Sequence, residues 1–454
     1  MTTTRLSALD DAFLKTESPT AHMHVGWVAV FDPPARGPRP SFESFRSHIE
    51  DRLGRAPRYR QKLCPAPLGL DAPSWVDDED FDIARHVTHS PDHDLDRVAA
   101  ECMSRPLARD RPLWEICIAD RLDGGSVGIV GKAHHCMVDG VAAVELALLL
   151  LDPTPEPNAE GGRRWRPGPH PGALARLGAG ASDRLGQQLE LARRGLSVLR
   201  SPGRMVRMPS AGARAAGAMA GALRPAEPVA PLNQPISTRR GLGRVQRPLA
   251  ELKTIKQAFR ATVNDAYLAI ATGAMRRLLA EHGQRPRPLK AMVPVNVRDD
   301  GQGEELGNRI SFMFVDLPCE EPDPGERLRR VKSAVGRNKR NRTPGAAEAA
   351  LDLLGQAPRG VQRLASRLIA SPHMFNLTVS NIPGPREPMY MLGCELREAY
   401  PVVPIPDRHA LSIGMTTVRD RACFGLYADR GSLGDVHGLS DAVEEACDEL
   451  LTVS

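Results

Sequence analysis

The sequence contains few aromatic residues and no long apolar run. Aromatic residues make up 4% of its 454 residues. The longest apolar stretch, Val141–Leu151, is interrupted by Glu145, whereas a membrane-spanning helix needs about 20 apolar residues. The N-terminal segment also lacks the apolar core of a signal peptide. We therefore expect a cytoplasmic protein that does not cross a membrane, although it can lie against one.

The eight cysteines include no CxxC pair. Scattered cysteines in a long chain are typical of reduced, buried thiols, so we expect neither a disulfide framework nor a zinc site. The net charge of +5 is small for this length, and a chain-wide nucleic-acid binder is usually more basic. Hydrophobic residues at 41% and charged residues at 25% are typical of a globular protein, which excludes a disordered, collagen-like or coiled-coil chain.

Positive charge is concentrated in one segment. Residues 161–226 contain 12 arginines, no lysine and only two acidic residues. The segment lies in a Pro-, Gly- and Arg-rich, partly helical connector that we place at residues 153–235. Two interpretations stay open: a solvated linker, or a basic arm for anionic lipid headgroups or an acidic cofactor. Because residues 161–226 hold a single aromatic residue, Trp165, base stacking on nucleic acid is disfavoured.

Strand patterns alternate with helix patterns on both sides of the connector. In residues 1–152 we predict helices at 41–54 and 139–151, and strands at 24–31, 113–121 and 126–134. In residues 236–454 we predict helices at 263–282, 325–341, 346–370 and 440–451, and strands at 289–298, 308–317, 375–381, 410–418 and 422–428. Thr262 and Asp265 form a capping box before the first of these helices. The similar halves permit a pseudo-duplicated α/β architecture.

The sequence HHCMVDG at residues 134–140 carries the strongest chemical signal. It stands where a predicted strand gives way to a predicted helix. Neighbouring strand residues face opposite sides, so one histidine can face a cavity while the other packs behind it. For the same reason the pair cannot readily hold one metal ion.

Each polar residue of this segment has a physical use. An imidazole at the mouth of a cleft suits general-base catalysis near neutral pH, with an alcohol or amine as the proton source. Asp139 can cap the following helix or pair with a cation, and Gly140 permits a tight turn into that helix.

The HHxxxDG pattern is the signature of the coenzyme A-dependent acyltransferases that include chloramphenicol acetyltransferase and the condensation domains of peptide synthetases. The whole chain resembles one branch of them, the bacterial wax ester synthase/acyl-CoA:diacylglycerol acyltransferases. The matching motifs occur in the family's order: LSALDDAFLKTESPTAHMHVG near the N-terminus, RPLWE at 111–115, PLNQPIS at 231–237, TVNDAYLA at 262–269, VPVNVR at 293–298, GNRIS at 307–311 and VSNIPGP at 379–385. Only the central connector is unmatched in detail.

The resemblance implies an α/β fold with mixed sheets: two chloramphenicol acetyltransferase-like subdomains with an active-site tunnel at their interface. It assigns His135 as the general base on the acceptor hydroxyl, and His134 as a structural residue. Asp139 is expected to organise the site by pairing with Arg298, unless that arginine is a surface residue at a strand end. No acyl-enzyme is required, and a buried cysteine is usually inert, so Cys136 is not expected to be a nucleophile.

Other matched positions are assigned to substrate binding or structural support. Trp114 lies near the substrate channel or in the core. Asn264 is a better functional candidate than Asp265, which the capping box already explains. Ser380 or Asn381 is a candidate hydrogen-bond donor to the oxyanion.

Glu17 matches an acidic family position, either on the acceptor side or as a solvated charge at a helix end. Ala8 stands where the family often has Ser or Pro, and Asn296 where it often has Ser. These departures leave the choice of acceptor open.

The resemblance therefore implies an O-acyltransferase that joins a fatty acyl group to diacylglycerol or to a long-chain alcohol. Acyl-CoA is then a co-substrate, and we expect no metal and no tightly bound cofactor. We expect a monomer or homodimer that contacts a membrane or lipid droplet peripherally and binds no nucleic acid. Two alternatives stay open: the same chemistry on a glycolipid or specialised metabolite, and a non-catalytic lipid-binding protein, against which the intact motif argues.

Overall fold

The computed structural model describes residues 4–66, 72–137, 149–156, 165–168, 225–296, 310–341, 368 and 370–454. This part of the chain contains two six-stranded sheets and one three-stranded sheet. The small sheet has the order β1–β4–β3, formed by Thr4–Arg5, Ser74–Asp77 and Gln61–Cys64. Strands and helices are mixed along the chain, as the α/β prediction requires.

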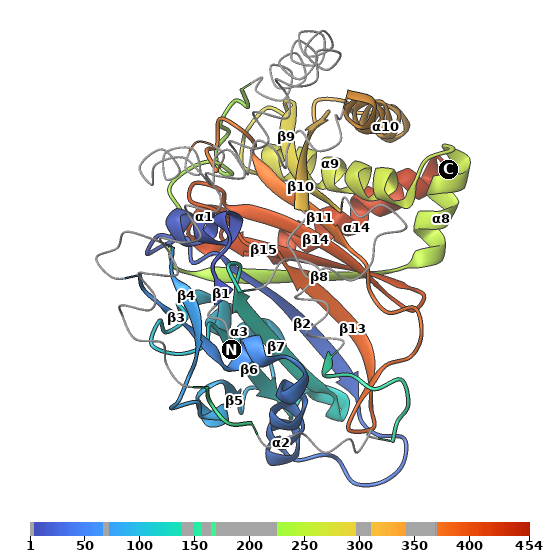
Figure 1. Ribbon diagram of the computed structural model, residues 1–454. Helices are drawn as coiled ribbons and strands as arrows, with labels where there is room; N and C mark the ends of the chain where they lie inside the picture. Colours follow the sequence, from blue (N-terminus) through green and yellow to red (C-terminus); the bar gives the residue numbers. More distant parts are fainter. Residues whose placement is uncertain are drawn as a thin grey trace, which may run out of the picture.

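The N-terminal sheet has the order β12–β13–β2–β7–β6–β5. Its strands are β2 (His24–Asp32), β5 (Val87–His89), β6 (Trp114–Ala119), β7 (Val127–His134), β12 (Tyr390–Met391) and β13 (Cys394–Val402). The β5–β6 pair is parallel and the other pairs are antiparallel. Two strands from late in the chain thus complete this sheet, and Figure 1 shows orange β13 beside blue β2.

The C-terminal sheet has the order β10–β9–β11–β14–β15–β8. Its strands are β8 (Arg240–Pro248), β9 (Leu289–Asn296), β10 (Ile310–Leu317), β11 (Leu377–Ile382), β14 (Leu411–Val418) and β15 (Arg421–Asp429). β11 runs parallel to β9 and β14, and the other pairs are antiparallel. Both large sheets are therefore mixed. β13 also packs against β14 and β15, which joins the two halves.

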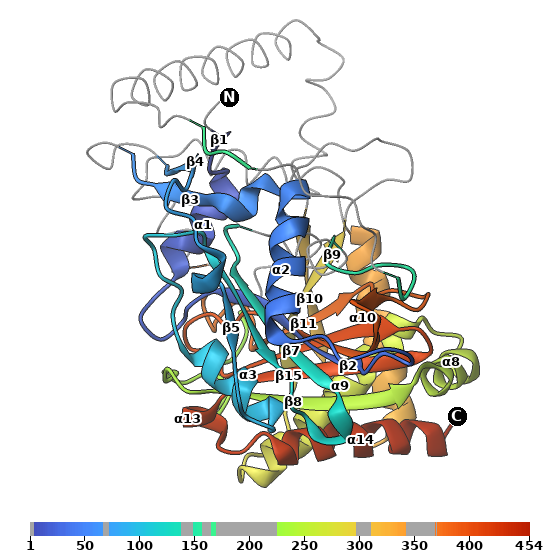
Figure 2. The ribbon, with the colours of Figure 1, turned by 90° about the horizontal axis from the view of Figure 1, so that it is seen from below.

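The helices lie on the faces of these sheets (Figures 1 and 2). α9 and α14 lie side by side on the C-terminal sheet, accompanied by α8 and α10. α3 packs between β7 of the N-terminal sheet and β8. The α-helices are α1 (Ala8–Thr16), α2 (Phe42–Arg52), α3 (Leu95–Ser104), α8 (Leu249–Ala258), α9 (Val263–Glu281), α10 (Pro324–Asn341), α13 (Arg430–Leu433) and α14 (His437–Thr452). Single 3-10 turns lie at Leu53–Arg55, Pro57–Arg60, Ile83–Arg85 and Asp123–Gly125.

Most predicted elements are present with small shifts at their ends. α9 begins at its capping box: the Thr262 hydroxyl accepts from the Asp265 amide at 3.1 Å, and the Asp265 carboxylate accepts from the Thr262 amide at 2.9 Å. The sequence-based prediction missed the helices α1, α3, α8 and α13 and the strands β1, β3, β4, β5, β8, β12 and β13. The predicted helices at 139–151 and 346–370 lie almost entirely outside the described residues.

The boundaries at residues 152 and 235 stay a prediction. β12 and β13 come from the segment assigned to the C-terminal subdomain but pair in the N-terminal sheet. Within the described residues, no helix is both long and apolar enough to span a bilayer.

Candidate active site

The histidine pair lies at the end of β7. His134 pairs in register with His24 of β2 and is 1% exposed, whereas His135 is half-buried. The His135 amide donates to the Met23 carbonyl at 3.0 Å. The His135 ring stacks on Phe13 of α1, with ring centroids 3.7 Å apart and planes 18° apart. The stacking fixes the orientation of the imidazole ring, which lies next to the start of β2.

His134 is a neutral, oriented imidazole. Its Nδ1 accepts from the Cys136 amide at 3.1 Å, so its proton belongs on Nε2. That Nε2 lies 3.8 Å from the Glu17 carboxylate. Burial, together with the charges of Arg109 and His135, holds the pKa of His134 well below its ordinary value. His134 therefore packs behind the strand end while His135 lies on its partly exposed side.

Glu17 ends α1 and forms an ion pair with Arg109. Its side chain is 20% exposed. The Glu17 carboxylate thus stands between Arg109 and His134, which is a different environment from that of a solvated charge at a helix end. Burial lowers the pKa of Arg109, but a guanidinium is so strong a base that it stays charged near neutral pH.

Cys136, next to His135, is a poor nucleophile. It is 2% exposed, and burial raises the pKa of its thiol far above the ordinary range. The thiolate is the reactive form of cysteine, and this environment suppresses it. A covalent acyl-cysteine intermediate is therefore disfavoured on physical grounds.

Three predicted site residues, Asp139, Gly140 and Arg298, lie outside the described residues. The expected pair between Asp139 and Arg298 therefore stays a prediction. No cluster of three or more His, Cys, Asp or Glu side chains in the described part of the chain is arranged to hold a metal ion.

The C-terminal half brings two predicted amides together. The Asn381 Nδ2 donates to the Asn264 Oδ1 at 3.5 Å. Ser380, the preceding residue, is buried, and its carbonyl accepts from the Tyr267 hydroxyl at 3.1 Å. Asp265 is the N3 residue of the capping box described above. The Asn264–Asn381 contact and the hydrogen bond from Tyr267 to Ser380 thus both join α9 to β11.

Trp114 is a packed core residue in this structure. It is 2% exposed, and its indole N–H donates to the Tyr59 carbonyl at 2.7 Å. Its ring stacks on His86 with centroids 4.6 Å apart. Its cross-strand partner is Ala133, next to the histidine pair, and a role beside the substrate channel stays a prediction.

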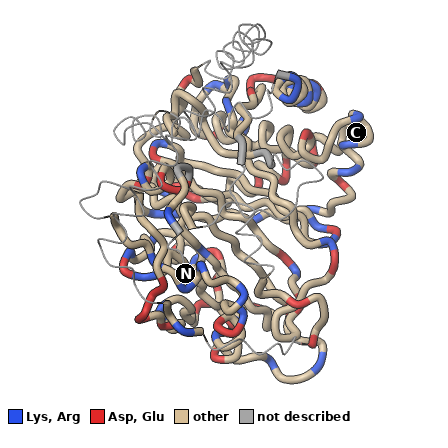
Figure 3. Tube along the Cα trace, viewed as in Figure 1, with Lys and Arg blue, Asp and Glu red and all other residues tan. Residues whose placement is uncertain are grey.

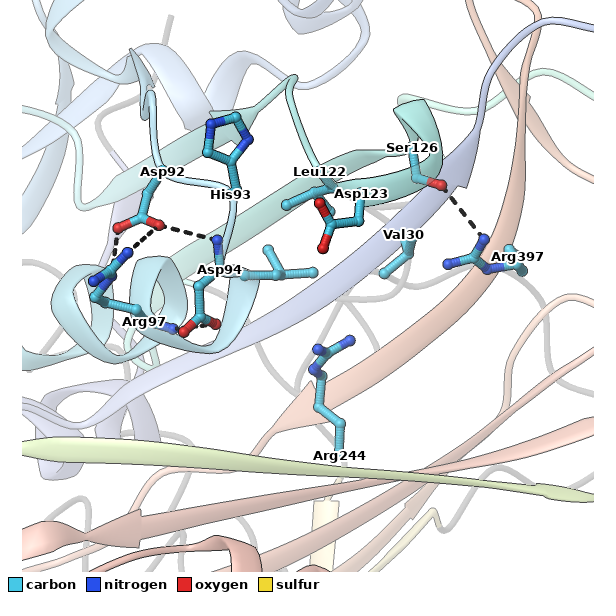
Figure 4. Close-up of a pocket in the computed structure, with 11 residues that line it drawn as sticks. Val30, Asp92, His93, Asp94, Arg97, Leu122, Asp123, Ser126, Arg244 and Arg397 are labelled. Carbon is cyan, nitrogen blue, oxygen red and sulfur yellow. Dashed lines mark hydrogen bonds and ion pairs between the residues drawn. The ribbon is translucent and has the colours of Figure 1, made fainter.

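Two cavities lie on opposite faces of β2. An apolar cavity of about 80 Å³ is lined by Val25, Trp27, Ala29 and Phe31 from β2, together with the turn at 382–385 and residues of β13. A polar cavity of about 440 Å³ lies beside Val30 (Figure 4). The arginines of the polar cavity already have anionic partners: Arg244 lies 2.5 Å from Asp96, and Arg397 lies 2.7 Å from Asp32.

The sequence analysis missed Phe13, Met23 and Arg109. Phe13 and Met23 fall inside the long N-terminal motif, but no periodicity shows that they meet residue 135. Arg109 lies just before RPLWE, and its contact with Glu17 joins segments about 90 residues apart.

The sequence profile of the wax ester synthase/diacylglycerol acyltransferase catalytic domain matches residues 6–267, and the profile of the family's C-terminal domain matches residues 306–451. Two proteins of Mycobacterium tuberculosis, both named probable diacylglycerol O-acyltransferase, are 31% identical to this chain. One match covers 99% of this chain and 96% of the relative. The other covers 97% of each.

Solved structures show the same fold. A wax ester synthase/diacylglycerol acyltransferase from Marinobacter aquaeolei VT8 superposes with a TM-score of 0.70 at 24% identity, covering 99% of both chains. A trichothecene 15-O-acetyltransferase from Fusarium sporotrichioides superposes with a TM-score of 0.61 at 10% identity, covering 99% of this chain and 94% of that one.

The match to the catalytic-domain profile and to the mycobacterial relatives defines the chain as an acyl-CoA-dependent acyltransferase, and its two-subdomain fold agrees with this. Within that class, the chain belongs to the wax ester synthase/diacylglycerol acyltransferase family.

Proposed function

We propose that this protein transfers a fatty acyl group from acyl-CoA to the hydroxyl of diacylglycerol or of a long-chain alcohol. The products are triacylglycerol or wax ester, and free CoA. The observation that carries the proposal is the arrangement of the histidine pair, with His135 stacked on Phe13 and partly exposed. Family membership and the names of the mycobacterial relatives support the same chemistry.

In the proposed mechanism, His135 removes the proton from the acceptor hydroxyl. The hydroxyl oxygen attacks the thioester carbonyl carbon and forms a tetrahedral oxyanion. Collapse of the oxyanion breaks the carbon–sulfur bond, and the CoA thiolate leaves and takes the proton from the His135 imidazolium. The enzyme ends unchanged, and no acyl-enzyme forms, in keeping with the suppressed thiolate of Cys136.

Neighbouring residues support this step. His134, as a neutral ring, accepts a hydrogen bond that stabilises the end of β7. Glu17 lies next to the His134 ring and is itself held by its ion pair with Arg109. The Asn264–Asn381 pair supplies amide donors for the oxyanion, and one such donor contributes about 2.7–4 kcal/mol to the transition state. We propose that Asp139 pairs with Arg298 and that Gly140 allows the chain to turn.

The proposed tunnel lies between the two halves, with acyl-CoA and acceptor entering from different sides. We propose peripheral contact with the inner face of a membrane or with a lipid droplet. α10 offers a basic surface for that contact, because six of its seven Arg or Lys residues are exposed and only Arg327 is buried. Figure 3 shows these blue positions along the helix. We propose no tightly bound cofactor, and a monomer or homodimer.

The test is an acyl-transfer assay with palmitoyl-CoA and either diolein or hexadecanol. CoA release is followed with a thiol reagent, and the lipid products are identified. We expect acceptor-dependent release that falls by about 10²–10⁴-fold in His135→Ala, because a general base contributes that much. Equal release by wild type and variant would refute the role of His135. Release with neither acceptor, from folded protein, would favour a specialised acceptor or a non-catalytic role.

A further inference from the structure

The apolar cavity begins on β2 close to the residue that contacts His135. Met23, just before β2, accepts the hydrogen bond from the His135 amide, and Val25, two residues later, lines the cavity. Trp27, Ala29 and Phe31 continue the lining, because alternate residues of a strand share one face. The cavity therefore follows β2 away from His135.

Both halves of the molecule form its walls. Across the sheet, Ala399 of β13 pairs with Ala29 and also lines the cavity. The turn from the end of β11, residues 382–385, covers it from the C-terminal half. A Cβ atom at Gly384 would lie 2.2 Å from the Thr417 carbonyl oxygen. The turn therefore packs directly against the backbone of β14, which fixes its position beside the cavity.

A glycine on the neighbouring strand shapes the middle of the cavity. A Cβ at Gly131 would lie 2.5 Å from the Trp27 ring. The absence of a side chain therefore lets the indole lie flat across β7 while it lines the cavity.

The chemistry of the lining selects an unbranched hydrocarbon. Its side chains are almost all apolar, with Thr416 and Tyr400 as the exceptions. A diacylglycerol acceptor carries two ester groups, which lose hydrogen bonds when they are buried without donors. A saturated acyl chain carries no polar atom beyond its thioester, so it fits such a lining without that cost.

The distances agree with a long chain. Ala29 lies six positions after Met23, which corresponds to about 20 Å along a strand. An extended palmitoyl chain also measures about 20 Å, since its carbon–carbon bonds are about 1.5 Å long. The small volume of the cavity, about 80 Å³, suits the last few methylenes rather than the whole chain.

We infer that this cavity receives the distal end of the donor's acyl chain, and that Ala29 and Ala399 set the longest chain accepted. The inference rests on the proposed acyl transfer and adds to it a specificity site. Both positions carry small side chains facing each other across β2 and β13, so one larger residue at either would shorten the cavity.

The test uses Ala29→Leu and, as a second variant should the first fold poorly, Ala399→Leu. Val30→Leu is the matched control, because Val30 stands next to Ala29 but lines the polar cavity on the opposite face. Binding is measured with S-octyl-, S-dodecyl- and S-hexadecyl-CoA thioethers, which are not turned over. Turnover is measured with the corresponding acyl-CoAs and diolein.

We expect wild type and Val30→Leu to bind more tightly as the chain lengthens. Leucine adds three carbon atoms, and each methylene excluded from an apolar site costs about fourfold in affinity. Ala29→Leu and Ala399→Leu should therefore bind S-octyl-CoA like wild type and should bind S-hexadecyl-CoA up to about 60-fold more weakly. Turnover should shift toward the shorter acyl-CoAs in the same variants.

The possible results separate this inference from the proposed function. If Ala29→Leu and Ala399→Leu keep the wild-type dependence of binding on chain length and still transfer acyl groups normally, only the cavity assignment is overturned. If the two leucine substitutions weaken the binding of the long thioethers, but neither wild type nor any variant transfers an acyl group, the cavity assignment is supported and the proposed function is overturned. A profile that follows the chain length of an alcohol acceptor, and not that of the donor, overturns the assignment to the acyl chain.

Discussion

Asp429 at the end of β15 is the acceptor for a buried cluster of donors. Its Oδ1 accepts from the Ser237 amide at 3.1 Å, from the Ser237 hydroxyl at 2.6 Å and from Arg240 Nη1 at 3.1 Å. Its Oδ2 accepts from the Ser432 amide at 2.9 Å and hydroxyl at 2.8 Å. Arg240 also donates to the carbonyls of Ser237 and Thr20. The pair thus ties the start of β8 to the N-terminal half.

Asp429→Asn should destabilise the fold strongly. The Asp429 and Arg240 side chains are 0% and 1% exposed, so neither charge is solvated. The substitution keeps the shape but replaces one acceptor oxygen with an NH₂ donor, which then faces other donors. It also leaves the guanidinium buried without its carboxylate. Removing one partner of a buried pair costs about 3–5 kcal/mol, and we expect a loss in that range.

The assay is urea unfolding at pH 7.5, followed by the fluorescence of the four tryptophans. Asp32→Asn is the matched control, because the Asp32–Arg397 pair is 44% and 45% exposed and such pairs contribute about 0–1 kcal/mol. A loss in Asp429→Asn no larger than the loss in Asp32→Asn would refute the reasoning.

The pH dependence offers a second check on the same residue. Burial by itself raises the pKa of Asp429, but hydrogen bonds from Ser237 and Ser432 and the charge of Arg240 outweigh it, so the net pKa is lowered. The stabilisation is therefore complete above the unfolded pKa of about 3.9 and is lost as the pH falls through the folded value. Wild type and Asp429→Asn should differ fully at neutral pH and converge only in strong acid.

Two further predictions concern the buried histidines and Cys136. Burial lowers the pKa of His24, His134 and His409, so below about pH 6.5 the unfolded chain binds protons that the folded chain does not. Stability is then complete above pH 6.5, and urea unfolding should show a loss of up to about 4 kcal/mol at pH 5.5; an unchanged free energy would contradict neutral histidines. Cys136→Ala should keep most of its acyl-transfer activity because the thiolate is suppressed, whereas a loss of several orders of magnitude would restore the covalent mechanism.

Much of the local structure could be read directly from the chain. The capping box of Thr262 and Asp265 set the start of α9, and short runs of mostly apolar residues identified β2, β7 and β14. Short-range hydrogen bonds and side-chain periodicity are properties of contiguous residues, so they are visible without a fold. The His134–His135 pair was visible for the same reason, and the general-base role proposed for His135 comes from the resemblance of this motif to that of the family.

Other features depend on contacts between distant segments. β13 was missed because its partner is β2, and the register of Glu395 opposite Asp32 joins residues more than 360 positions apart. No local sequence pattern around Glu17 indicates that its carboxylate lies between Arg109 and His134. Nothing in the motif LSALDDAFLK shows that Phe13 will cover the ring of His135.

The sequence by itself thus indicated the family, many of the helices and strands, and the proposed general base His135, because these follow from nearby residues and their order. The tertiary structure decided which histidine is buried and which lies partly exposed. It also decided that β2, β13 and the turn at 382–385 enclose an apolar cavity along the strand that meets His135. Such a cavity is defined by atoms from segments far apart in the chain, so only their packing in space creates it.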